Sequence, residues 1–317
     1  MKKIIVTGGL GYKGSVLVKK LLNKGYIVTV IDANWFGNFL KAHTNLSIIR
    51  LDTRLIDTLP SFDADVIVHL AAVANDPSSE INSKLTWETS TLATMKILEK
   101  MKNDGVSQII YASSGSVYGI KDEDKVTENL DLVPITDYNK SKMITERILL
   151  SYKKYFSMQI IRPATVCGVS PRMRFDLSVN LLTMQALKNN LINVYGGNQI
   201  RPNIHIDDIT NLYVDCVENP SKYQGIYNCS FENLSILEIA EMISKETGAE
   251  IKVTKSNDPR SYRMCSDKLT DAGFVPKKSV IDAIREIKYL YDKNLINDNE
   301  KFHNLNWMKK NIDSILK

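Results

Sequence analysis

The segment Y-N-K-S-K at 138–142 places Tyr138 and Lys142 one helical turn apart. Positions i and i+4 share one face of a helix, so the phenol and the ammonium can both point at a single ligand. A nearby cation favours the phenolate, which lowers the pKa of the tyrosine and lets it act as a base near neutral pH. Ser114 and Ser116 follow a predicted strand, where a hydroxyl can hold a substrate oxygen beside the phenol. The tyrosine–lysine pair alone is also compatible with a solvated helix face, but with the serines it predicts an acid–base centre.

A second pattern begins directly after the first predicted strand. The segment T-G-G-L-G-Y-K-G at 7–14 spaces Gly8, Gly11 and Gly14 as G-x-x-G-x-x-G at the start of a helix. Glycines allow the tight turn and the close approach of a diphosphate, whose charge the helix N-terminus attracts. Asp32 ends the second predicted strand, where a carboxylate can accept from adenosine ribose hydroxyls and would repel a 2′-phosphate. These features predict a dinucleotide site that prefers NAD to NADP.

Further residues near these motifs complete the predicted cofactor site. Small residues after the predicted strand at 65–70 let a ribose lie close, and the residues from 52 onward can reach the adenine edge. The other expected cofactor-binding residues are Tyr12, Lys13, Asp52, Thr53, Leu70, Ala71, Ala72, Tyr138 and Lys142. Lys13 receives no separate role, because its long stem can extend over the helix start. His69 is expected to be a buried structural imidazole rather than a catalyst.

Hydrophobic periodicity predicts the elements that position these residues. Apolar runs rich in β-branched residues predict buried parallel strands at 3–7, 27–31, 65–70, 106–112 and 158–162. Helical spacing alternates with them at 14–23, 85–102 and 139–155. After about residue 165 the pattern predicts short strands near 192–195, 203–206 and 225–229, and helices at 176–189, 207–217, 234–246, 279–294 and 307–316.

This order predicts an α/β protein with a Rossmann-type, doubly wound parallel sheet and a smaller C-terminal α/β substrate lobe. We expect residues 1–168 to form the NAD-binding domain, with parts of 200–230 returning to it. Residues 169–317 are expected to form the smaller nucleotide-sugar-binding lobe.

Composition excludes several other classes of protein. The 317 residues are 44% hydrophobic, which excludes a disordered chain, a collagen and a disulfide-stapled scaffold. The net charge of +5 contains no basic block, so it fits an anionic small ligand as well as nucleic acid. No apolar run resembles a signal peptide or approaches the roughly 18 residues of a membrane helix, so we expect a cytoplasmic protein. The widely spaced cysteines are expected to be free, and the four histidines offer no framework for a metal site.

The chain resembles the extended short-chain dehydrogenase/reductase family, in its NAD-dependent nucleotide-sugar epimerase/dehydratase branch (UDP-glucose 4-epimerase-like). In family order, the matching segments are 7–14, Asp32, D-T-R at 52–54, H-L-A-A at 69–72, S-S-G-S-V-Y-G at 113–119, 138–142, R-P-A-T-V-C-G at 162–168, R-P-N-I-H-I-D-D-I at 201–209 and R-S-Y-R at 260–263. The resemblance implies Ser114, Tyr138 and Lys142 as the catalytic triad. It also implies epimerisation of a nucleotide-diphosphate sugar, at C4 through a transient 4-keto intermediate, for surface polysaccharide or sugar-nucleotide biosynthesis.

Two departures from the family pattern narrow the chemistry. Gly115 and Ser116 stand where 4,6-dehydratases of the family carry an Asp-Glu pair, and neither can do that acid–base work. This leaves C4 epimerisation, or oxidation and reduction at C4 by a 4-dehydrogenase or 4-keto-reductase. Thr89-Ser90-Thr91 replaces the asparagine of many members, and Ser90 is a candidate substitute.

The resemblance also implies a site for the nucleotide diphosphate, and guanidinium forks suit phosphate oxygens. The expected substrate-binding residues are Ser114, Ser116, Asn180, Arg172, Arg174, Arg201 and Arg260. For any single arginine the alternative is a surface ion pair. Nothing in the sequence identifies the sugar or the base.

The expected partner is a nucleotide-diphosphate sugar, without nucleic acid or membrane. Family members commonly pair through the helices equivalent to 85–102 and 139–155, which implies a homodimer. A different class of function is a non-catalytic Rossmann protein that senses NAD or binds RNA. Such a protein would not require Ser114, Tyr138 and Lys142 together.

Overall fold

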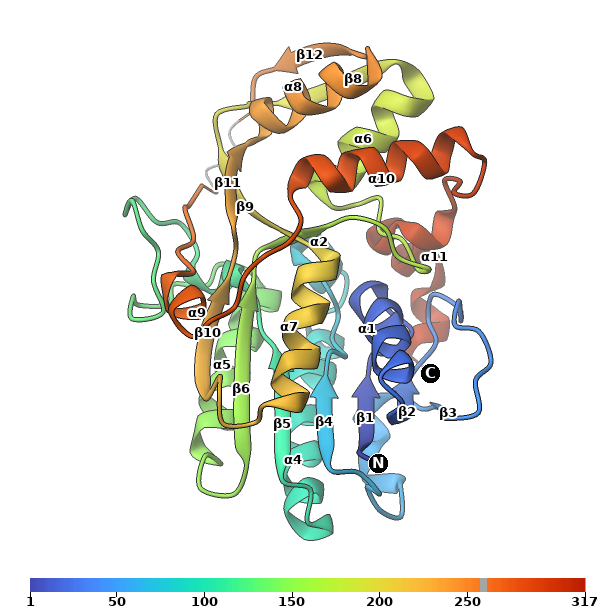
Figure 1. Ribbon diagram of the computed structural model, residues 1–317, viewed down its shortest axis with the longest axis vertical. Helices are drawn as coiled ribbons and strands as arrows, with labels where there is room; N and C mark the ends of the chain where they lie inside the picture. The colour runs from blue at the N-terminus through green and yellow to red at the C-terminus, as the bar shows by residue number, and fades with distance from the viewer. Residues whose placement is uncertain (257–260, 317) are drawn as a thin grey trace.

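A computed structural model of the protein describes residues 1–256 and 261–316. Its largest element is a seven-stranded sheet with all neighbouring strands parallel, in the order β10-β6-β5-β4-β1-β2-β3 (Figure 1). The strands are β1 (Lys3–Thr7), β2 (Ile27–Asp32), β3 (Leu46–Arg50), β4 (Val66–His69), β5 (Gln108–Ala112), β6 (Ser157–Pro163) and β10 (Gly225–Cys229). The predicted α/β class and doubly wound sheet are confirmed.

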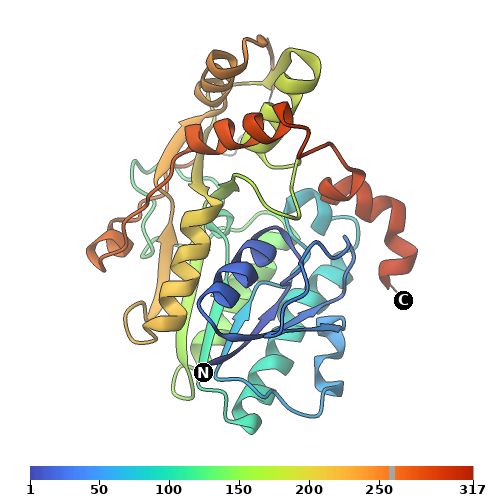
Figure 2. The same ribbon diagram turned by 45° about the vertical axis from the view of Figure 1, so that its right-hand side comes forward.

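Helices cover both faces of this sheet, because successive strand residues point to opposite sides. Helices α1 (Tyr12–Asn23) and α7 (Ile206–Glu218) cover one face, and α4 (Ala93–Asp104) and α5 (Asp137–Ser151) cover the other (Figures 1 and 2). In β1, Ile4 and Val6 belong to the core on the α1 side, whereas Ile5 belongs to the core on the α4 side. Both faces are therefore dry, which explains why the strands read as continuous apolar runs.

The helix expected at 85–102 has an irregular first half. It consists of α3 (Ser83–Trp87), a π-helical turn (Glu88–Leu92) and then α4. The helix expected at 139–155 begins earlier and ends earlier than predicted. It begins after Thr136, whose side chain accepts a hydrogen bond from the backbone N–H of Asn139 at 3.3 Å.

A smaller lobe lies beyond the carboxyl ends of the strands (top of Figure 1). It contains α6 (Ser178–Asn189), α8 (Ile236–Thr247), α10 (Val280–Asp292) and a parallel pair of strands, β8 (Leu191–Tyr195) and β12 (Glu250–Thr254). Its apolar core is separate from the two cores of the large sheet. A three-stranded sheet, β11 (Glu232–Ser235), β9 (Ile200–His205) and β7 (Thr165–Cys167), accompanies them. The remaining short helices are α2 (Asp76–Ser79) and α9 (Asp267–Asp271), with 3₁₀ turns at Thr53–Thr58, Gly115–Tyr118 and Glu300–Phe302.

The last helix, α11 (Asn304–Leu316), leaves the smaller lobe and returns to the larger one (right side of Figures 1 and 2). Its Met308 and Ile315 form an apolar cluster with Val73 and Leu85, which lie between β4 and the π-helical turn of the larger lobe. The domain boundary at residue 168 stays a prediction. The chain nevertheless crosses back to the large sheet twice, once through α7 and β10 and once through α11.

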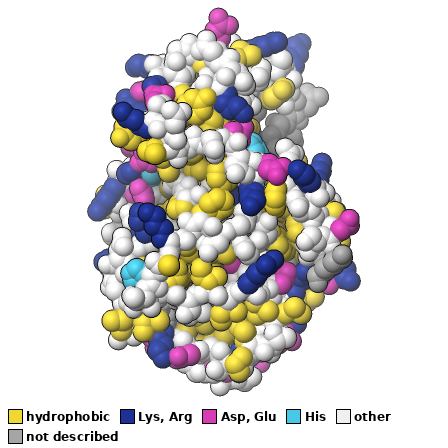
Figure 3. Space-filling model, turned by 90° about the vertical axis from the view of Figure 1, so that its right-hand side faces the viewer, with side chains coloured by type: hydrophobic (Ala, Val, Ile, Leu, Met, Phe, Trp, Pro, Cys, Tyr) yellow, Lys and Arg dark blue, Asp and Glu magenta, His cyan; other side chains and the backbone are white. Residues whose placement is uncertain are grey.

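The surface seen in Figure 3 carries basic and acidic side chains interspersed, rather than one basic patch. The net charge of +5 is thus not concentrated on this face. Among the described residues, no helix is long and apolar enough to cross a membrane. All four cysteines are free, as predicted; Cys167, Cys216 and Cys229 are buried, whereas Cys265 is half-buried.

Candidate active site

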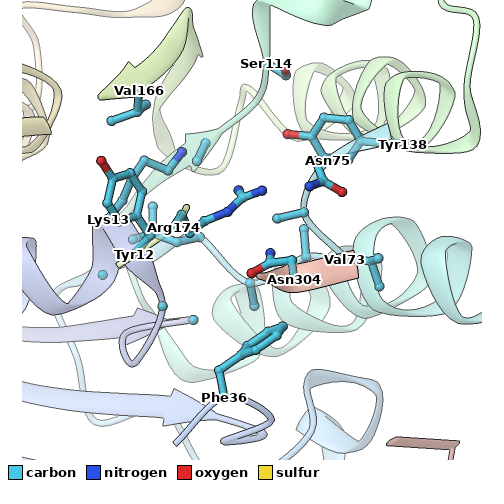
Figure 4. Close-up of a pocket in the computed structure, with 18 of the residues that line it drawn as sticks. Tyr12, Lys13, Phe36, Val73, Asn75, Ser114, Tyr138, Val166, Arg174 and Asn304 are labelled. Atoms are coloured by element: carbon cyan, nitrogen blue, oxygen red, sulfur yellow. The ribbon is translucent and has the colours of Figure 1, made fainter. Parts of the chain in front are cut away.

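A cavity of about 320 Å³ lies where the carboxyl ends of the strands meet the smaller lobe (Figure 4). Its lining contains every predicted cofactor-binding residue, namely Gly8, Gly11, Tyr12, Lys13, Gly14, Asp32, Asp52, Thr53, Leu70, Ala71, Ala72, Tyr138 and Lys142. Ser114, Ser116, Arg172 and Arg174 line the same cavity. Residues far apart in the sequence are therefore brought to one site, at the edge where doubly wound sheets bind their ligands.

The glycine turn leaves a cradle at the start of α1 that a side chain would fill. Gly8 has φ +70°, and a Cβ built on it would lie 2.7 Å from the backbone N of Ala71. A Cβ on Gly14 would collide with the carbonyl oxygen of Gly8. The first N–H groups of α1 lack intrahelical partners, so together with the positive end of the helix dipole they suit a diphosphate.

Asp32 lies at the end of β2, at the edge of this cradle. Its carboxylate accepts hydrogen bonds from the backbone N–H of Leu10 at 3.0 Å and of Asn34 at 2.8 Å. Burial raises the pKa of Asp32, and these two backbone donors oppose that shift. The carboxylate keeps further acceptor capacity for ribose hydroxyls, so cradle and carboxylate together fit a dinucleotide without a 2′-phosphate.

Asp52 contributes mainly to structure. Its carboxylate accepts from the backbone N–H of Arg54 and forms an ion pair with the guanidinium of the same residue, each at 2.9 Å. It thereby caps the 3₁₀ turn that begins at Thr53. Thr53 is buried and faces the cavity.

Ser114 caps the 3₁₀ turn Gly115–Tyr118 after β5. Its Oγ accepts from the backbone N–H of Ser116 at 3.2 Å and lies 2.7 Å from the Oγ of Ser116. The Ser116 hydroxyl in turn donates to the side-chain oxygen of Asn139 on α5. Because the Ser116 proton is used on Asn139, the Ser114 hydroxyl donates to Ser116 here, and it must rotate to donate to a ligand oxygen.

Tyr138 and Lys142 lie on the first two turns of α5, as the i, i+4 spacing predicts. The hydroxyls of Tyr138 and Ser114 point toward one another at the cavity (Figure 4). Lys142 is buried; its Nζ donates to the carbonyl of Ala112 at 2.7 Å and lies 5.9 Å from the centre of the Tyr138 ring.

The pKa of Tyr138 shifts in the opposite direction to the one expected. Burial raises it, and the hydrogen bond with Ser114 only partly opposes that rise. The physical reason is burial of the phenol itself, and the Lys142 ammonium donates to the carbonyl of Ala112 rather than to the phenol. Burial, reinforced by the charge of Lys13, lowers the pKa of Lys142 to about 7.

An ion-pair network not foreseen from the sequence holds the serine segment against α5. Arg162 donates to both carboxylate oxygens of Glu146, from Nε at 2.9 Å and from Nη2 at 2.6 Å. Ser113 donates to the same carboxylate at 2.5 Å, and Arg162 donates to the hydroxyl of Tyr118 at 2.7 Å. Tyr118 donates onward to Asn228 at 2.8 Å. The network therefore fixes the strand end that precedes Ser114 relative to the helix that carries Tyr138.

His69 is a buried structural imidazole, as predicted. Its ring nitrogens bond the hydroxyls of Thr7 at 2.6 Å and Thr94 at 2.9 Å, and burial lowers its pKa to about 3. Thr94 also donates to the backbone carbonyl of Ser90, in the π-helical turn, at 2.5 Å. The Ser90 hydroxyl is buried and has no hydrogen-bond partner in the described part of the chain. The contact with Thr94 is thus made by the backbone carbonyl of Ser90 and not by its hydroxyl.

Arg172 and Arg174 both line the cavity, but they face different neighbours. Arg174 forms a bidentate pair with Asp176 at 2.9 and 2.8 Å, and its charge acts on Tyr138. The guanidinium of Arg172 lies 4.1 Å from the centre of the Phe36 ring and donates to Asn304.

The structure places Asn180 away from the described lining of the cavity. Its side chain accepts from the backbone N–H of Gly168 and donates to the Tyr12 hydroxyl and to the carbonyl of Arg174, each at 3.0 Å. The amide is thereby fully engaged within the protein. In this structure Asn180 positions Arg174 and Tyr12, and its contact with the substrate stays a prediction.

Arg201 and Arg260, the two other predicted substrate residues, stay predictions. Arg201, on β9, is not among the described residues that line the cavity, although its charge acts on Tyr262, which does line it. Arg260 lies outside the described residues. The sequence reasoning also missed Phe36, Asn304 and other lining residues. The signal for Phe36 was the pair of aromatic residues that follows the carboxylate at the end of β2.

Fold and cavity together are typical of a dinucleotide-dependent enzyme, with Ser114, Tyr138 and Lys142 as the candidate catalytic residues. A family model described as the NAD dependent epimerase/dehydratase family matches residues 4–230, and the chain belongs to this family. NAD is accordingly its cofactor.

Similar proteins of known identity extend over nearly the whole chain. The UDP-glucose 4-epimerase of Corynebacterium glutamicum is 25% identical over 308 residues, covering 90% of this chain and 94% of that protein. Among solved structures, the UDP-N-acetylglucosamine 4-epimerase of Methanobrevibacter ruminantium, in complex with UDP-N-acetylmuramic acid, is 25% identical with a TM-score of 0.83 and coverage of 92% and 99%. The UDP-glucuronic acid 4-epimerase of Bacillus cereus, in complex with UDP-glucuronic acid and NAD, is 27% identical with a TM-score of 0.78 and coverage of 91% and 100%.

Proposed function

We propose that the protein epimerises a nucleotide-diphosphate sugar at C4. The observation that carries this proposal is the convergence of the Ser114 and Tyr138 hydroxyls, beside Lys142, on the cavity that also contains the glycine cradle and Asp32. Similar proteins named UDP-glucose, UDP-arabinose and UDP-glucuronic acid 4-epimerase support the same reaction.

Each residue of the centre has a distinct part in the reaction. Tyr138 removes the proton from the sugar O4, and Ser114 donates a hydrogen bond to that oxygen. Burial opposes the phenolate, so positive charge from Lys142, one helical turn away, would add to that of Arg174 in stabilising it. Bound NAD supplies a hydride acceptor that can return the hydride to the opposite face of C4. Gly8, Gly11, Gly14 and Asp32 would hold the cofactor in place.

Gly115 favours epimerisation over 4,6-dehydration on steric as well as chemical grounds. A Cβ at this position would lie 2.7 Å from the sulfur of Met264 and 3.2 Å from the carbonyl oxygen of Pro163. An acidic side chain here would have to displace packed neighbours. The dehydratase-type acid is therefore absent at this position, and introducing one would require the Met264 side chain to move.

A homodimer is the assembly that we propose. Leu92 and Met95, at the start of α4, and Ile144 on α5 are apolar and exposed to 51%, 42% and 37%. Pairing of two copies through these helices would cover them. Light scattering should give twice the chain mass of 35.8 kDa, whereas a monomer mass would remove this proposal. The free thiols fit a reducing compartment such as the cytoplasm.

The second candidate is a 4-dehydrogenase or 4-keto-reductase, because the same three residues serve oxidation at C4. Incubation with UDP-, GDP-, CDP- and dTDP-sugars, followed by NMR and by NADH absorbance, separates the two. Inversion at C4 without net NADH supports the epimerase. Accumulation of NADH, or inversion at no carbon of any sugar, would overturn it.

A further inference from the structure

We propose that the C-terminal helix α11 forms part of the cofactor site, where Arg172, held by Asn304 of that helix, binds the diphosphate of NAD. The inference rests on NAD binding in the cavity but not on the identity of the sugar substrate. It reassigns Arg172 from the substrate to the cofactor and gives α11 a direct part in cofactor binding.

The position of Arg172 places it at the Asp32 end of the cavity. Its guanidinium stacks at 4.1 Å on Phe36, which follows Asp32 closely along the chain. The charge of Asp32 acts on Arg172, after those of Arg174 and Asp176, whereas the arginine whose charge acts on Tyr138 is Arg174. Of the two arginines, Arg172 is thus the one that faces Phe36 and Asp32, and Arg174 is the one that faces Tyr138.

Arg172 is also a buried cation that lacks an anionic partner in the described structure. Its side chain is 1% exposed. Nη2 donates to the Asn304 side-chain oxygen at 2.5 Å and to the carbonyl of Lys301 at 3.1 Å. Nε is buried and has no hydrogen-bond partner among the described residues. A buried guanidinium paired only with neutral acceptors is costly, so an anion contributed by a ligand would compensate it.

The dinucleotide diphosphate supplies such an anion at this place. Its phosphates are expected over the start of α1, between Asp32 and the catalytic centre, and Arg172 lines the same cavity. Guanidinium–phosphate bonds are among the stronger hydrogen bonds in proteins.

Helix α11 completes the wall around Arg172. Asn304 and Met308 line the cavity together with Asp32 and Phe36. Trp307 donates from Nε1 to the carbonyl of Trp35 at 2.7 Å, which ties the helix to the loop after β2.

A second attachment lies further along the helix. Arg54 donates from Nη2 to the carbonyl of Ile315 at 3.0 Å, and Ile315 belongs to the apolar cluster with Val73 and Leu85. This segment lies outside the residues matched by the family model, 4–230. Cofactor binding and docking of α11 should therefore stabilise each other.

The first test compares Arg172→Met with Arg285→Met, an exposed arginine paired with Glu246. Dissociation constants for NAD, ADP and adenosine are measured by calorimetry on nucleotide-depleted enzyme, without any sugar substrate. We expect Arg172→Met to weaken NAD and ADP binding by roughly 10- to 100-fold and to leave adenosine binding unchanged. Arg285→Met should bind all three as wild type does.

The KM for the nucleotide sugar, measured at saturating NAD, separates the two assignments of Arg172. An unchanged KM with weakened NAD binding supports the proposal. A raised KM with unchanged NAD binding would show that Arg172 binds the substrate and would overturn the proposal. No change in KM or in NAD binding would show that Arg172 binds neither ligand, which would overturn it as well. All three results are distinct from a failure of epimerisation, because NAD binding is measured without a sugar.

The second test addresses α11 without any substitution, so it does not depend on a variant folding. Hydrogen exchange of the amides in 304–316 is compared in wild-type enzyme with and without NAD, using α8 as the internal reference. We expect NAD to slow exchange in α11 and to leave α8 unchanged. Equal exchange of α11 in both samples would overturn its place in the cofactor site.

Discussion

Arg162 on β6 and Glu146 on α5 form an ion pair in which Nη2 and Oε2 lie 2.6 Å apart and both side chains are almost fully buried. Neither residue is among the described residues that line the cavity. Through Ser113 the pair fixes the strand end that precedes Ser114, and through α5 it fixes Tyr138. The distance between the two catalytic hydroxyls thus depends on a contact made outside the site.

Glu146→Gln should therefore destabilise the protein strongly, because it leaves the Arg162 guanidinium buried without a charge partner. We expect a loss of about 3–5 kcal/mol in the free energy of unfolding, measured by denaturant titration. Glu246→Gln is the matched control, since it breaks an exposed pair with Arg285 and should cost less than about 1 kcal/mol. Equal effects of the two substitutions would show that the buried pair does not hold these elements together.

Tyr138→Phe removes the catalytic base and preserves the ring. Turnover should fall on the order of 10²- to 10⁴-fold, while the unfolding temperature stays unchanged. Tyr195→Phe is the control, because Tyr195 is 62% exposed on β8. Unchanged turnover in Tyr138→Phe would refute the catalytic assignment.

Asp32→Asn should narrow the preference for NAD over NADP. The substitution removes the charge that repels a 2′-phosphate and keeps the bonds from Leu10 and Asn34 possible. Calorimetry with both dinucleotides measures the ratio of affinities in each protein. Tighter binding of NADP than NAD by the wild type would contradict the role given to Asp32.

Lys13 makes NAD affinity dependent on pH. Burial, reinforced by the charge of Arg174, lowers the pKa of Lys13 to about 8. The ammonium attracts the diphosphate when protonated, so affinity should decrease as the pH rises through this value.

Lys13→Met should bind NAD more weakly near neutral pH and lose this part of the pH dependence, leaving the contribution of Lys142. Calorimetric titrations across the range measure both effects. Lys19→Met, an exposed lysine of α1, should behave as wild type. An identical profile in Lys13→Met and wild type would exclude a contact between Lys13 and the cofactor.

The sequence predicts the large sheet and the cofactor end of the site well, for a local reason. The inner strands of the parallel sheet are buried on both faces and appear as apolar runs, and the glycines follow the first run directly, whereas the edge strand β3 is largely exposed. Short or exposed strands cannot be predicted from apolar runs. Strand β7 has three residues, and β12 is largely exposed, so neither leaves an apolar run in the sequence.

Side-chain partners across the fold could not be predicted in this way. Periodicity shows that Glu146 lies on a helix, but not that it meets Arg162 on a strand. The same holds for Asn180, whose amide bonds Tyr12 and Arg174. The packing of α11 against the cofactor cavity could not be predicted either, because no residue near Asn304 in the sequence indicates a contact with the loop after β2.

The most direct test of the central claim follows the hydrogen on C4 of the sugar. The enzyme is incubated in D2O with the nucleotide sugar that it converts, and the product is examined by NMR. Removal and return of a hydride at one carbon predicts inversion at C4 with protium retained there and at C5. Deuterium at C4 would show inversion by proton exchange with solvent, and deuterium at C5 would show dehydratase-type chemistry; either result would contradict the account.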